Sequence, residues 1–276
     1  PLSWWRMGDG DTWNGSVWTL TDNGSGGNDA TSVFMEEADR LPISPNSYSL
    51  NSFVFDGIDE YFDVGNPSSL QITGALTISA WVKTTNTSTN GIIVGKDGVS
   101  TGTRSYQIQH ASTGEARFVI FKSGGQGLVS STTLINDGNW HHVMGVNDGA
   151  DLKIYIDGVL ENTTIGGGGT ILNGTSYFAI GRREANAPQN ILWYNGNIDE
   201  VAVWNSDQSL NVSTIFNNGI PQDISSLSPL SHWRMGENAT WNGSVWTLTD
   251  QGSGGNNATS VFMEEADKTG DQPYVI

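Results

Sequence analysis

Short segments of alternating apolar and polar residues recur along the middle of the chain. Residues 76–82, 116–120 and 152–156 each show a period of two, which is typical of a strand with one face in a core. The third segment runs into the Asp-Gly dipeptide at 157–158, which favours a tight hairpin turn. Strands that recur at intervals of roughly 10 to 15 residues predict an all-β, antiparallel two-sheet sandwich or jelly roll.

One segment shows the helical period instead. In residues 209–217 the apolar side chains of Val212, Ile215 and Phe216 fall on one face, and Ser209 is a suitable N-cap. The pattern predicts one short helix, which we expect to close one open end of the sandwich.

The two ends of the chain have nearly the same amino-acid sequence. Residues 1–40 recur at 229–268, and only seven of the forty positions differ, so both copies should adopt one backbone conformation. The remaining residues, 269–276, are too few to supply another sandwich. The sequence therefore predicts a jelly-roll domain at 1–220, a linker at 221–228, a partial second copy at 229–268 and a tail.

Large apolar side chains in this second copy need a place to be buried. They include Trp233, Trp246, Val261 and Phe262, and leaving such side chains in water forfeits about 1.5 to 3 kcal/mol apiece. An open strand edge also invites pairing with another sheet. We therefore expect the second copy to dock on the outside of the first domain or to pair with another copy of the protein.

Charge and hydropathy argue against two classes of partner. The chain has 12 Lys plus Arg and 29 Asp plus Glu among 276 residues, which gives a formal net charge of −17. Nucleic-acid binding needs a cluster of cations, so no nucleic-acid partner is expected. No stretch of about 18 apolar residues occurs, so no membrane insertion is expected.

With no cysteine, disulfides and thiolate metal sites are excluded.

Six segments in order carry a resemblance to a known family. They are residues 5–28, 53–61, 76–82, 140–143, 156–158 and 196–204. Together they resemble the laminin-G-like, concanavalin-A-like jelly-roll family. The resemblance implies two antiparallel sheets and, for most members, binding of sugars or proteins. Fold alone does not fix function, so the sites need their own argument.

The repeated Trp-Arg-Met-Gly opening also resembles tandem modules in structural proteins of marine tailed phages. That resemblance implies a virion structural or fibre-type module, at a virion surface or otherwise outside a cell, that binds neighbouring subunits, other virion proteins or a host glycan. The alternative is a secreted bacterial carbohydrate-binding or adhesion module.

The family resemblance also implies a calcium ion at the rim of the sandwich. The matching positions are Asp22, Asn28, Asp56, Asp59 and Asp199. Hard oxygen ligands from separate loops suit calcium. The alternative is that these residues form turns and bond nearby backbone amides. Asp199 is the most informative, because it lies within a strand, where Asp is disfavoured.

The carboxylates do not predict an enzyme. Glu200 follows Asp199 directly, and successive strand residues face opposite sides, so the two are not expected to act as a pair. Residues 37–39, Glu-Ala-Asp, come nearest to a glycosidase pattern, but Pro42 stands where the third acid is required. We therefore expect a binding module without catalytic residues.

Aromatic residues near Asn- and Gly-rich loops are candidates for contact with sugar rings. Trp193, Tyr194 and Trp13 are the candidates, whereas Trp18 has apolar neighbours that favour a packed strand. The adjacent histidines at 141–142 should point to opposite faces of a core strand, which excludes a shared metal ion.

Overall fold

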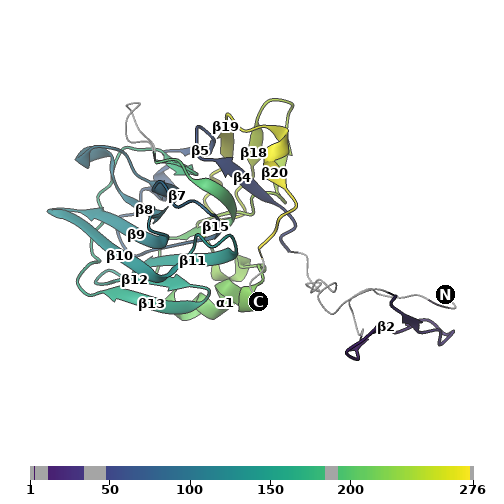
Figure 1. Ribbon diagram of the computed structural model, residues 1–276. Coiled ribbons are helices and arrows are strands. Elements are labelled where there is room, and N and C mark those ends of the chain that lie inside the picture. Colours follow the sequence, from purple (N-terminus) through teal and green to yellow (C-terminus); the bar gives the residue numbers. More distant parts are fainter. Residues whose placement is uncertain (1–2, 4–11, 34–47, 184–191, 274–276) are drawn as a thin grey trace. The chain divides into compact units, whose positions relative to one another are not determined.

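The computed structural model describes residues 3, 12–33, 48–183 and 192–273. The chain divides into two compact units, Pro1–Ser47 and Tyr48–Ile276. Both large sheets belong to the second unit (Figure 1). Within the described ranges, no helix is long and apolar enough to cross a membrane.

One sheet of the second unit has nine antiparallel strands, in the order β10-β9-β8-β7-β14-β5-β19-β18-β17. In chain order these strands are β5 Tyr61–Gly65, β7 Gly91–Lys96, β8 Tyr106–His110, β9 Glu115–Lys122, β10 Gly125–Leu134, β14 Phe178–Ile180, β17 Ala239–Trp241, β18 Trp246–Leu248 and β19 Ala258–Val261.

The other sheet has eight antiparallel strands, seven of them in the order β13-β12-β11-β6-β15-β4-β20, with β16 also paired to β15. In chain order these strands are β4 Ser52–Asp56, β6 Leu76–Lys83, β11 Trp140–Asn147, β12 Leu152–Ile156, β13 Val159–Thr164, β15 Asn195–Trp204, β16 Ser231–Trp233 and β20 Lys268–Thr269.

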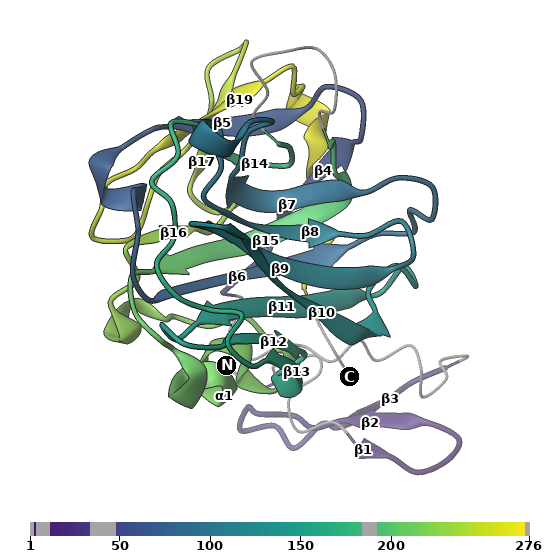
Figure 2. The ribbon, with the colours of Figure 1, turned by 90° about the vertical axis from the view of Figure 1, so that its left-hand side faces the viewer.

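The two sheets face each other and enclose the main core (Figure 2). Because side chains alternate along a strand, every second residue of β6, such as Ile78 and Val82, points inward and is fully buried. Phe118 of β9 meets them from the opposite sheet and is also fully buried. The predicted all-β two-sheet sandwich, including its three alternating segments, is confirmed.

The one α-helix among the residues that the structure describes covers the outer face of the eight-stranded sheet. Helix α1, Val212–Phe216, packs its Val212 and Ile215 into a second apolar cluster with Met144, Tyr155 and Trp204 of the sheet. The short helix was predicted correctly. Its expected place across an open end was wrong, because the side chains it covers lie on a sheet face.

The helix caps also differ from the expectation. A 3-10 turn, Ser209–Asn211, precedes α1, and Ser209 makes no side-chain capping bond. At the other end Asn217 adopts a left-handed conformation, with φ at 47°, and ends the helix. Asn tolerates this conformation better than most residues with a side chain.

The C-terminal copy is built into the sandwich, which corrects the predicted domain boundaries. Strands β17, β18 and β19 extend the nine-stranded sheet, and β19 pairs with β5. Strand β16 pairs with β15 and β20 pairs with β4 in the other sheet. Figure 1 shows three of these late strands, β18, β19 and β20, coloured yellow, beside β4 and β5. The copy therefore supplies strands to both sheets instead of docking outside a finished domain.

Burial in the shared core explains this placement. Six side chains of the C-terminal copy enter the core between the sheets: Trp233, Met235, Trp246, Leu248, Ala258 and Met263. The ring of Trp246 meets Phe53 edge to face at 5.2 Å, and that of Trp233 lies 5.3 Å from Phe178. Phe262, in contrast, is 70% exposed and Val261 is half-buried.

The predicted tail also takes part in the fold. Asp271 accepts hydrogen bonds from the Trp140 indole at 2.9 Å and from the Lys83 amine at 2.7 Å. Its backbone carbonyl accepts a third from Ser52 at 2.6 Å. The sandwich unit therefore runs from Tyr48 to the C-terminal residues.

The N-terminal copy forms a small sheet of its own. Strands β1 (Thr12–Trp13), β2 (Trp18–Leu20) and β3 (Ala30–Thr31) pair in that order, all antiparallel. The Trp-Arg-Met-Gly opening and the Glu-Ala-Asp triplet at 37–39 lie outside the described residues. The predicted domain at 1–220 is corrected to a first unit and a sandwich that begins at Tyr48.

Candidate functional site

A β-bulge in β15 places two consecutive acids side by side. Between its pairs with Trp81 and Ser79 of β6, strand β15 advances three residues, from Asp199 to Ala202, while β6 advances two. The extra residue is accommodated by a left-handed backbone at Glu200, with φ at 46°. The expectation that Asp199 and Glu200 face opposite sides was wrong, because it assumed an unbroken strand.

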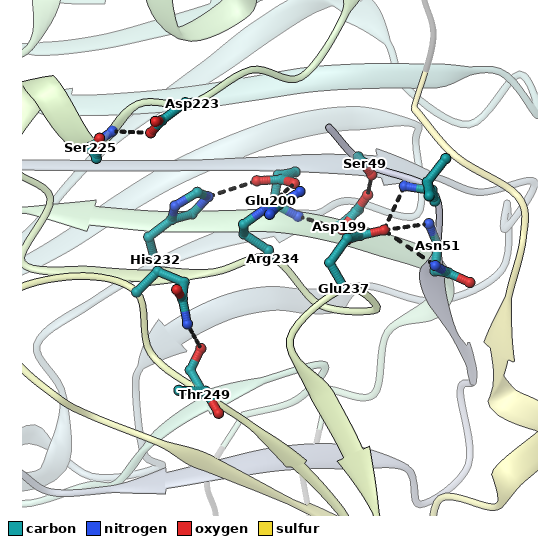
Figure 3. A network of polar contacts seen from close by, with 12 residues as sticks. Ser49, Asn51, Asp199, Glu200, Asp223, Ser225, His232, Arg234, Glu237 and Thr249 are labelled. Atoms are coloured by element: carbon teal, nitrogen blue, oxygen red, sulfur yellow. Dashed lines mark hydrogen bonds and ion pairs between the residues drawn. The ribbon is translucent and has the colours of Figure 1, made fainter. Parts of the chain in front are cut away.

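The bulge brings these acids together with one from the C-terminal copy. Asp199, Glu200 and Glu237 each offer an oxygen atom, and these atoms lie within 4.8 Å of one another (Figure 3). We call these three residues the carboxylate cluster. It lies where β15, the start of the sandwich unit and the C-terminal copy meet.

The Glu200 carboxylate is held by two basic side chains of the C-terminal copy. His232 Nε2 lies 2.7 Å from Glu200 Oε2, and Arg234 Nε lies 3.4 Å from Oε1. The Arg234 guanidinium also stacks on the Tyr48 ring at 3.5 Å. Both Glu200 oxygens therefore already have partners.

Asp199 has much less compensation for its charge. Its side chain is fully buried, its Oδ2 accepts a hydrogen bond from Ser49 Oγ at 2.5 Å, and its Oδ1 accepts one from the Glu200 backbone amide at 2.8 Å, but neither donor is charged. Burial, with smaller contributions from Glu200 and Glu237, raises the pKa of Asp199 well above the usual value of 3.8. The carboxyl group therefore tends to hold a proton, or needs a cation beside it.

Glu237 connects the cluster to the backbone. Its Oε1 accepts bonds from the Leu50 amide at 2.5 Å and the Asn51 amide at 2.8 Å. Its other oxygen, Oε2, is buried and finds no donor among the described residues. A hard cation coordinated by Glu237 and Asp199 would satisfy this oxygen and offset the buried charge. The donor set thus fits calcium in chemical type.

The other residues in the expected calcium set lie elsewhere. Asp56 is opposite Asn195 in the β4–β15 pair, four residues along β15 from Asp199, or about 13 Å at strand spacing. Its Oδ1 accepts the Ile58 amide at 2.7 Å and the Asp59 amide at 3.4 Å, so it forms the turn between β4 and β5. Among the described residues, Asp56 and Asp59 do not join Asp199 in a cluster.

Asp22 and Asn28 belong to the first unit. The two oxygens of Asp22 accept the Gly24 amide at 2.7 Å and the Asn28 amide at 2.8 Å. These bonds close the Gly-rich loop on itself, which is the turn-forming alternative considered above.

A second candidate surface combines two rings and a cation. The Trp193 and Tyr61 rings lie 5.9 Å apart, and the Arg182 guanidinium lies 3.6 Å from the Tyr61 ring centre and 5.4 Å from that of Trp193. We call these three residues the aromatic platform. All three are half-buried. Such a cation held over an aromatic face fixes the rings in place.

Strand pairing and a backbone hydrogen bond fix the positions of Tyr61 and Trp193 in the aromatic platform. Tyr61 begins β5, where it pairs with Val261 of the C-terminal copy. Trp193 lies between Leu192, whose carbonyl accepts the Ile92 amide at 3.0 Å, and buried Tyr194. A side chain at Gly91 would come within 2.8 Å of the Trp193 carbonyl, so this close approach requires glycine.

The other predicted aromatic contacts differ from Trp193. Tyr194 is 1% exposed and packs in the core near Phe55, so its prediction as a contact residue was wrong. Trp13 is half-buried and lies 5.5 Å from Trp18 in the first unit.

The adjacent histidines behave as core residues: the His142 ring contacts the Trp81 ring, and the His141 ring forms a hydrogen bond of 2.8 Å with Asp157.

Sequence reasoning missed Glu237, Tyr61 and Arg182. For Glu237 a signal was available, since the N-terminal copy also has an acid, Asp9, at the equivalent place. Tyr61 and Arg182 come from strands that are far apart in sequence, and no local pattern joins them to Trp193.

Comparisons with known proteins agree with this architecture. A family profile described as the Concanavalin A-like lectin/glucanases superfamily matches residues 56–216, more than half of the chain. Comparison with the curated proteins gives no match.

One solved structure shows a similar fold at low sequence identity, and two further structures match more weakly. A putative carbohydrate binding protein from Bacteroides ovatus has a TM-score of 0.63 at 17% identity, over 94% of this chain and 69% of that one. A heptameric SAP-like pentraxin from Limulus polyphemus has a TM-score of 0.47 at 17% identity, over 74% and 96%. The CBM40 of a Ruminococcus gnavus IT-sialidase, bound to α2,3 sialyllactose, has 0.48 at 15% identity, over 60% and 98%.

Proposed function

Because the chain belongs to the concanavalin A-like lectin/glucanase superfamily, we propose that it is a non-catalytic module that binds carbohydrate. The observation that carries the proposal is the aromatic platform of Trp193, Tyr61 and Arg182. Rings held at fixed angles supply large contact area at low conformational cost, and an arginine adds hydrogen-bond donors for hydroxyl or carboxylate groups. The structurally similar Bacteroides ovatus protein is itself described as a putative carbohydrate binding protein.

The carboxylates support binding over hydrolysis. Glycosidases commonly place two carboxyl groups about 5 to 9.5 Å apart on either side of a sugar. In the carboxylate cluster the oxygens lie within 4.8 Å of one another, and Asp199 and Glu200 are buried. A sugar ring does not fit between them.

For the carboxylate cluster we propose a structural calcium ion. Asp199 and Glu237 would hold it, with the Ser49 hydroxyl as a neighbouring oxygen, because both Glu200 oxygens are engaged by His232 and Arg234. When bound, the ion would supply positive charge and tie β15 to the C-terminal copy. This set replaces the expected positions Asp22, Asn28, Asp56 and Asp59, and keeps only Asp199 of the five.

The proposed setting is outside a cell, on a virion or on a bacterial surface. The net charge of −17 favours solubility, and the absence of cysteine leaves packing and metal binding to provide durability. A virion fibre or capsid-surface module and a secreted bacterial adhesion module would both use a glycan-binding face in this way.

We expect Trp193→Ala to weaken glycan binding at least tenfold, which corresponds to about 1.4 kcal/mol. The full chain is first screened on an array of immobilised neutral and acidic oligosaccharides, and the best ligand is then titrated calorimetrically. Tyr177→Ala is the matched control, because Tyr177 is 47% exposed and does not belong to the platform.

Unchanged affinity in the Trp193 variant, or an equal loss in the Tyr177 variant, would show that the platform is not the binding surface. If the array gives no ligand above background, the carbohydrate proposal itself fails.

A further inference from the structure

The two copies of the repeated segment adopt the same local structure. In the first copy Thr12 pairs with Thr19, and in the second the equivalent Thr240 pairs with Thr247. The two tryptophan rings of the hairpin lie 5.5 Å apart in the first copy and 5.3 Å apart in the second. Residues 12–33 of the N-terminal copy therefore already have the strand pairing that residues 240–261 have within the sandwich.

Side-chain bonds repeat as faithfully as the strands. The backbone amide of Trp18 donates to Ser32 Oγ at 2.8 Å, and that of Trp246 donates to Ser260 Oγ at the same distance. Asp250 accepts two amides of its Gly-rich loop, as Asp22 does in the first copy.

The N-terminal copy also keeps the six buried core residues of the C-terminal copy, although Asp11 stands in place of Ala239, which is half-buried against the core. The six core residues of the C-terminal copy have identical counterparts, which are Trp5, Met7, Trp18, Leu20, Ala30 and Met35. The seven differences between the copies leave all six positions untouched. Volume and shape at these positions are therefore the same for either copy, as a close-packed core requires.

The surroundings of the two copies are what differ. Strand β3 is the edge strand of its three-stranded sheet, whereas the equivalent β19 pairs with β5. Leu248 and Ala258 are 1% and 0% exposed, but their counterparts Leu20 and Ala30 are only half-buried. The N-terminal copy thus carries an apolar face and a strand edge suited to the place that the C-terminal copy fills.

We propose that the two copies are alternative occupants of one place in the sandwich, and that the N-terminal copy can displace the C-terminal copy of the same chain. The tether favours the same chain over a second molecule, because it raises the effective concentration of the N-terminal copy. Arg40 is equivalent to Lys268, which pairs with Phe53. Twelve residues separate Arg40 from Phe53, enough for the chain to turn back and form that pair.

The exchange would change the carboxylate cluster. Two of the seven differences bear on it, since Asp9 is equivalent to Glu237 of the cluster and Trp4 is equivalent to His232, the partner of Glu200. With the N-terminal copy in place, Glu200 loses its histidine partner, and the displaced C-terminal copy is left with an open strand edge. One chain thereby has two states that differ in which end can join another sheet.

Paired cysteine substitutions test the exchange in the full chain, which has no cysteine of its own. Thr259 pairs with Asp63 of β5, so Thr31 takes that position if the N-terminal copy enters. Facing antiparallel residues have Cα atoms about 4.5 to 5.5 Å apart, within the range of a disulfide. Thr31→Cys with Asp63→Cys reports the exchanged state, and Thr259→Cys with Asp63→Cys is the matched control for the resident state.

Both proteins are incubated in a glutathione redox buffer and analysed by non-reducing electrophoresis and peptide mapping. We expect a disulfide between positions 31 and 63 within single chains. Its yield should rise at least fivefold when Trp246→Ala weakens the resident copy, and should fall to background when Trp18→Ala weakens the incoming one. Circular dichroism checks that each variant is folded.

Failure to form this disulfide, in a chain whose control pair at 259 and 63 closes fully, overturns the proposal. This comparison does not need the Trp246 variant, so it holds even if that variant does not fold. Disulfide-linked ladders at multiples of the chain mass would overturn the same-chain assignment and indicate that the N-terminal copy enters a second molecule.

Discussion

In a buffer that contains a chelator, the protein should lose stability as the pH rises, and Asp199→Asn should remove part of that loss. Burial holds the pKa of Asp199 above its ordinary value of 3.8, so the folded state binds its proton more tightly than the unfolded state does. A group whose pKa is raised on folding contributes its full stabilisation at a pH below its pKa in the unfolded state. This stabilisation is lost as the pH rises through its pKa in the folded state. The decline therefore begins near pH 4 and continues upward.

At pH 8 we expect Asp199→Asn to be more stable than the parent by roughly 1 to 3 kcal/mol, the usual cost of a buried group that lacks compensation. Urea unfolding at pH 5 and pH 8 measures the difference. The pKa of Glu60 is raised to about 7, mainly by burial, but this group titrates in both proteins and cancels in the comparison.

Equal changes in stability between pH 5 and pH 8 for parent and variant would contradict the assigned state of Asp199. His232 and Arg234 face Glu200 in both proteins, so neither explains a difference between them.

Calcium should reverse the loss of stability at high pH. An ion that binds only the folded state stabilises it by about 2.7 kcal/mol when present at 100 times its dissociation constant. At pH 8 we expect calcium to raise the melting temperature of the parent by several degrees, measured by tryptophan fluorescence. Glu237→Gln should abolish most of this shift, because it removes one of the two proposed ligands.

Asp56→Asn serves as the control, since Asp56 lies in a turn outside the carboxylate cluster. A melting temperature that is indifferent to both calcium and chelator would remove the calcium proposal. A shift that survives in the Glu237 variant and is lost in the Asp56 variant would move the ion to the β4–β5 turn.

Local sequence patterns were enough to predict the strands and the sandwich. Residues 152–156 alternate because one face of β12 lies in the core, and the Asp-Gly pair that follows adopts left-handed backbone at both positions, with φ at 50° and 78°. Periodicity and turn chemistry act over a few residues, so they can be read from the chain without knowing its partners.

The same patterns could not decide which copy of the repeat completes the sandwich. Both copies carry identical core residues, such as Trp18 and Trp246, and the choice depends on which copy pairs with β5 and β15, which no local pattern within either copy specifies. The predicted boundaries gave this place to the first copy, whereas the structure gives it to the second.

The candidate sites were predicted less well for a related reason. Asp199 was singled out because Asp is unusual within a strand, and it does lie in a cluster of carboxylates. Its partners were missed because the bulge at Glu200 breaks the alternation, and Glu237 belongs to a segment assigned to another domain. Tyr61 was missed because it meets Trp193 only through the sheet.

The placement of the C-terminal copy is the central claim, because that copy both pairs with Tyr61 of the platform and supplies Glu237 to the cluster. Hydrogen–deuterium exchange of the full chain tests it directly. Peptides covering 245–261 and 17–33 differ in mass through Gln251 and Asn257, so the two copies can be followed separately. We expect amides of the C-terminal copy to exchange nearly as slowly as those of β6, and those of the N-terminal copy to exchange much faster, because a sheet of three short strands opens more readily than a large two-sheet sandwich. If the 245–261 peptide instead exchanges as fast as the 17–33 peptide, the C-terminal copy is not part of the sandwich and the account is wrong.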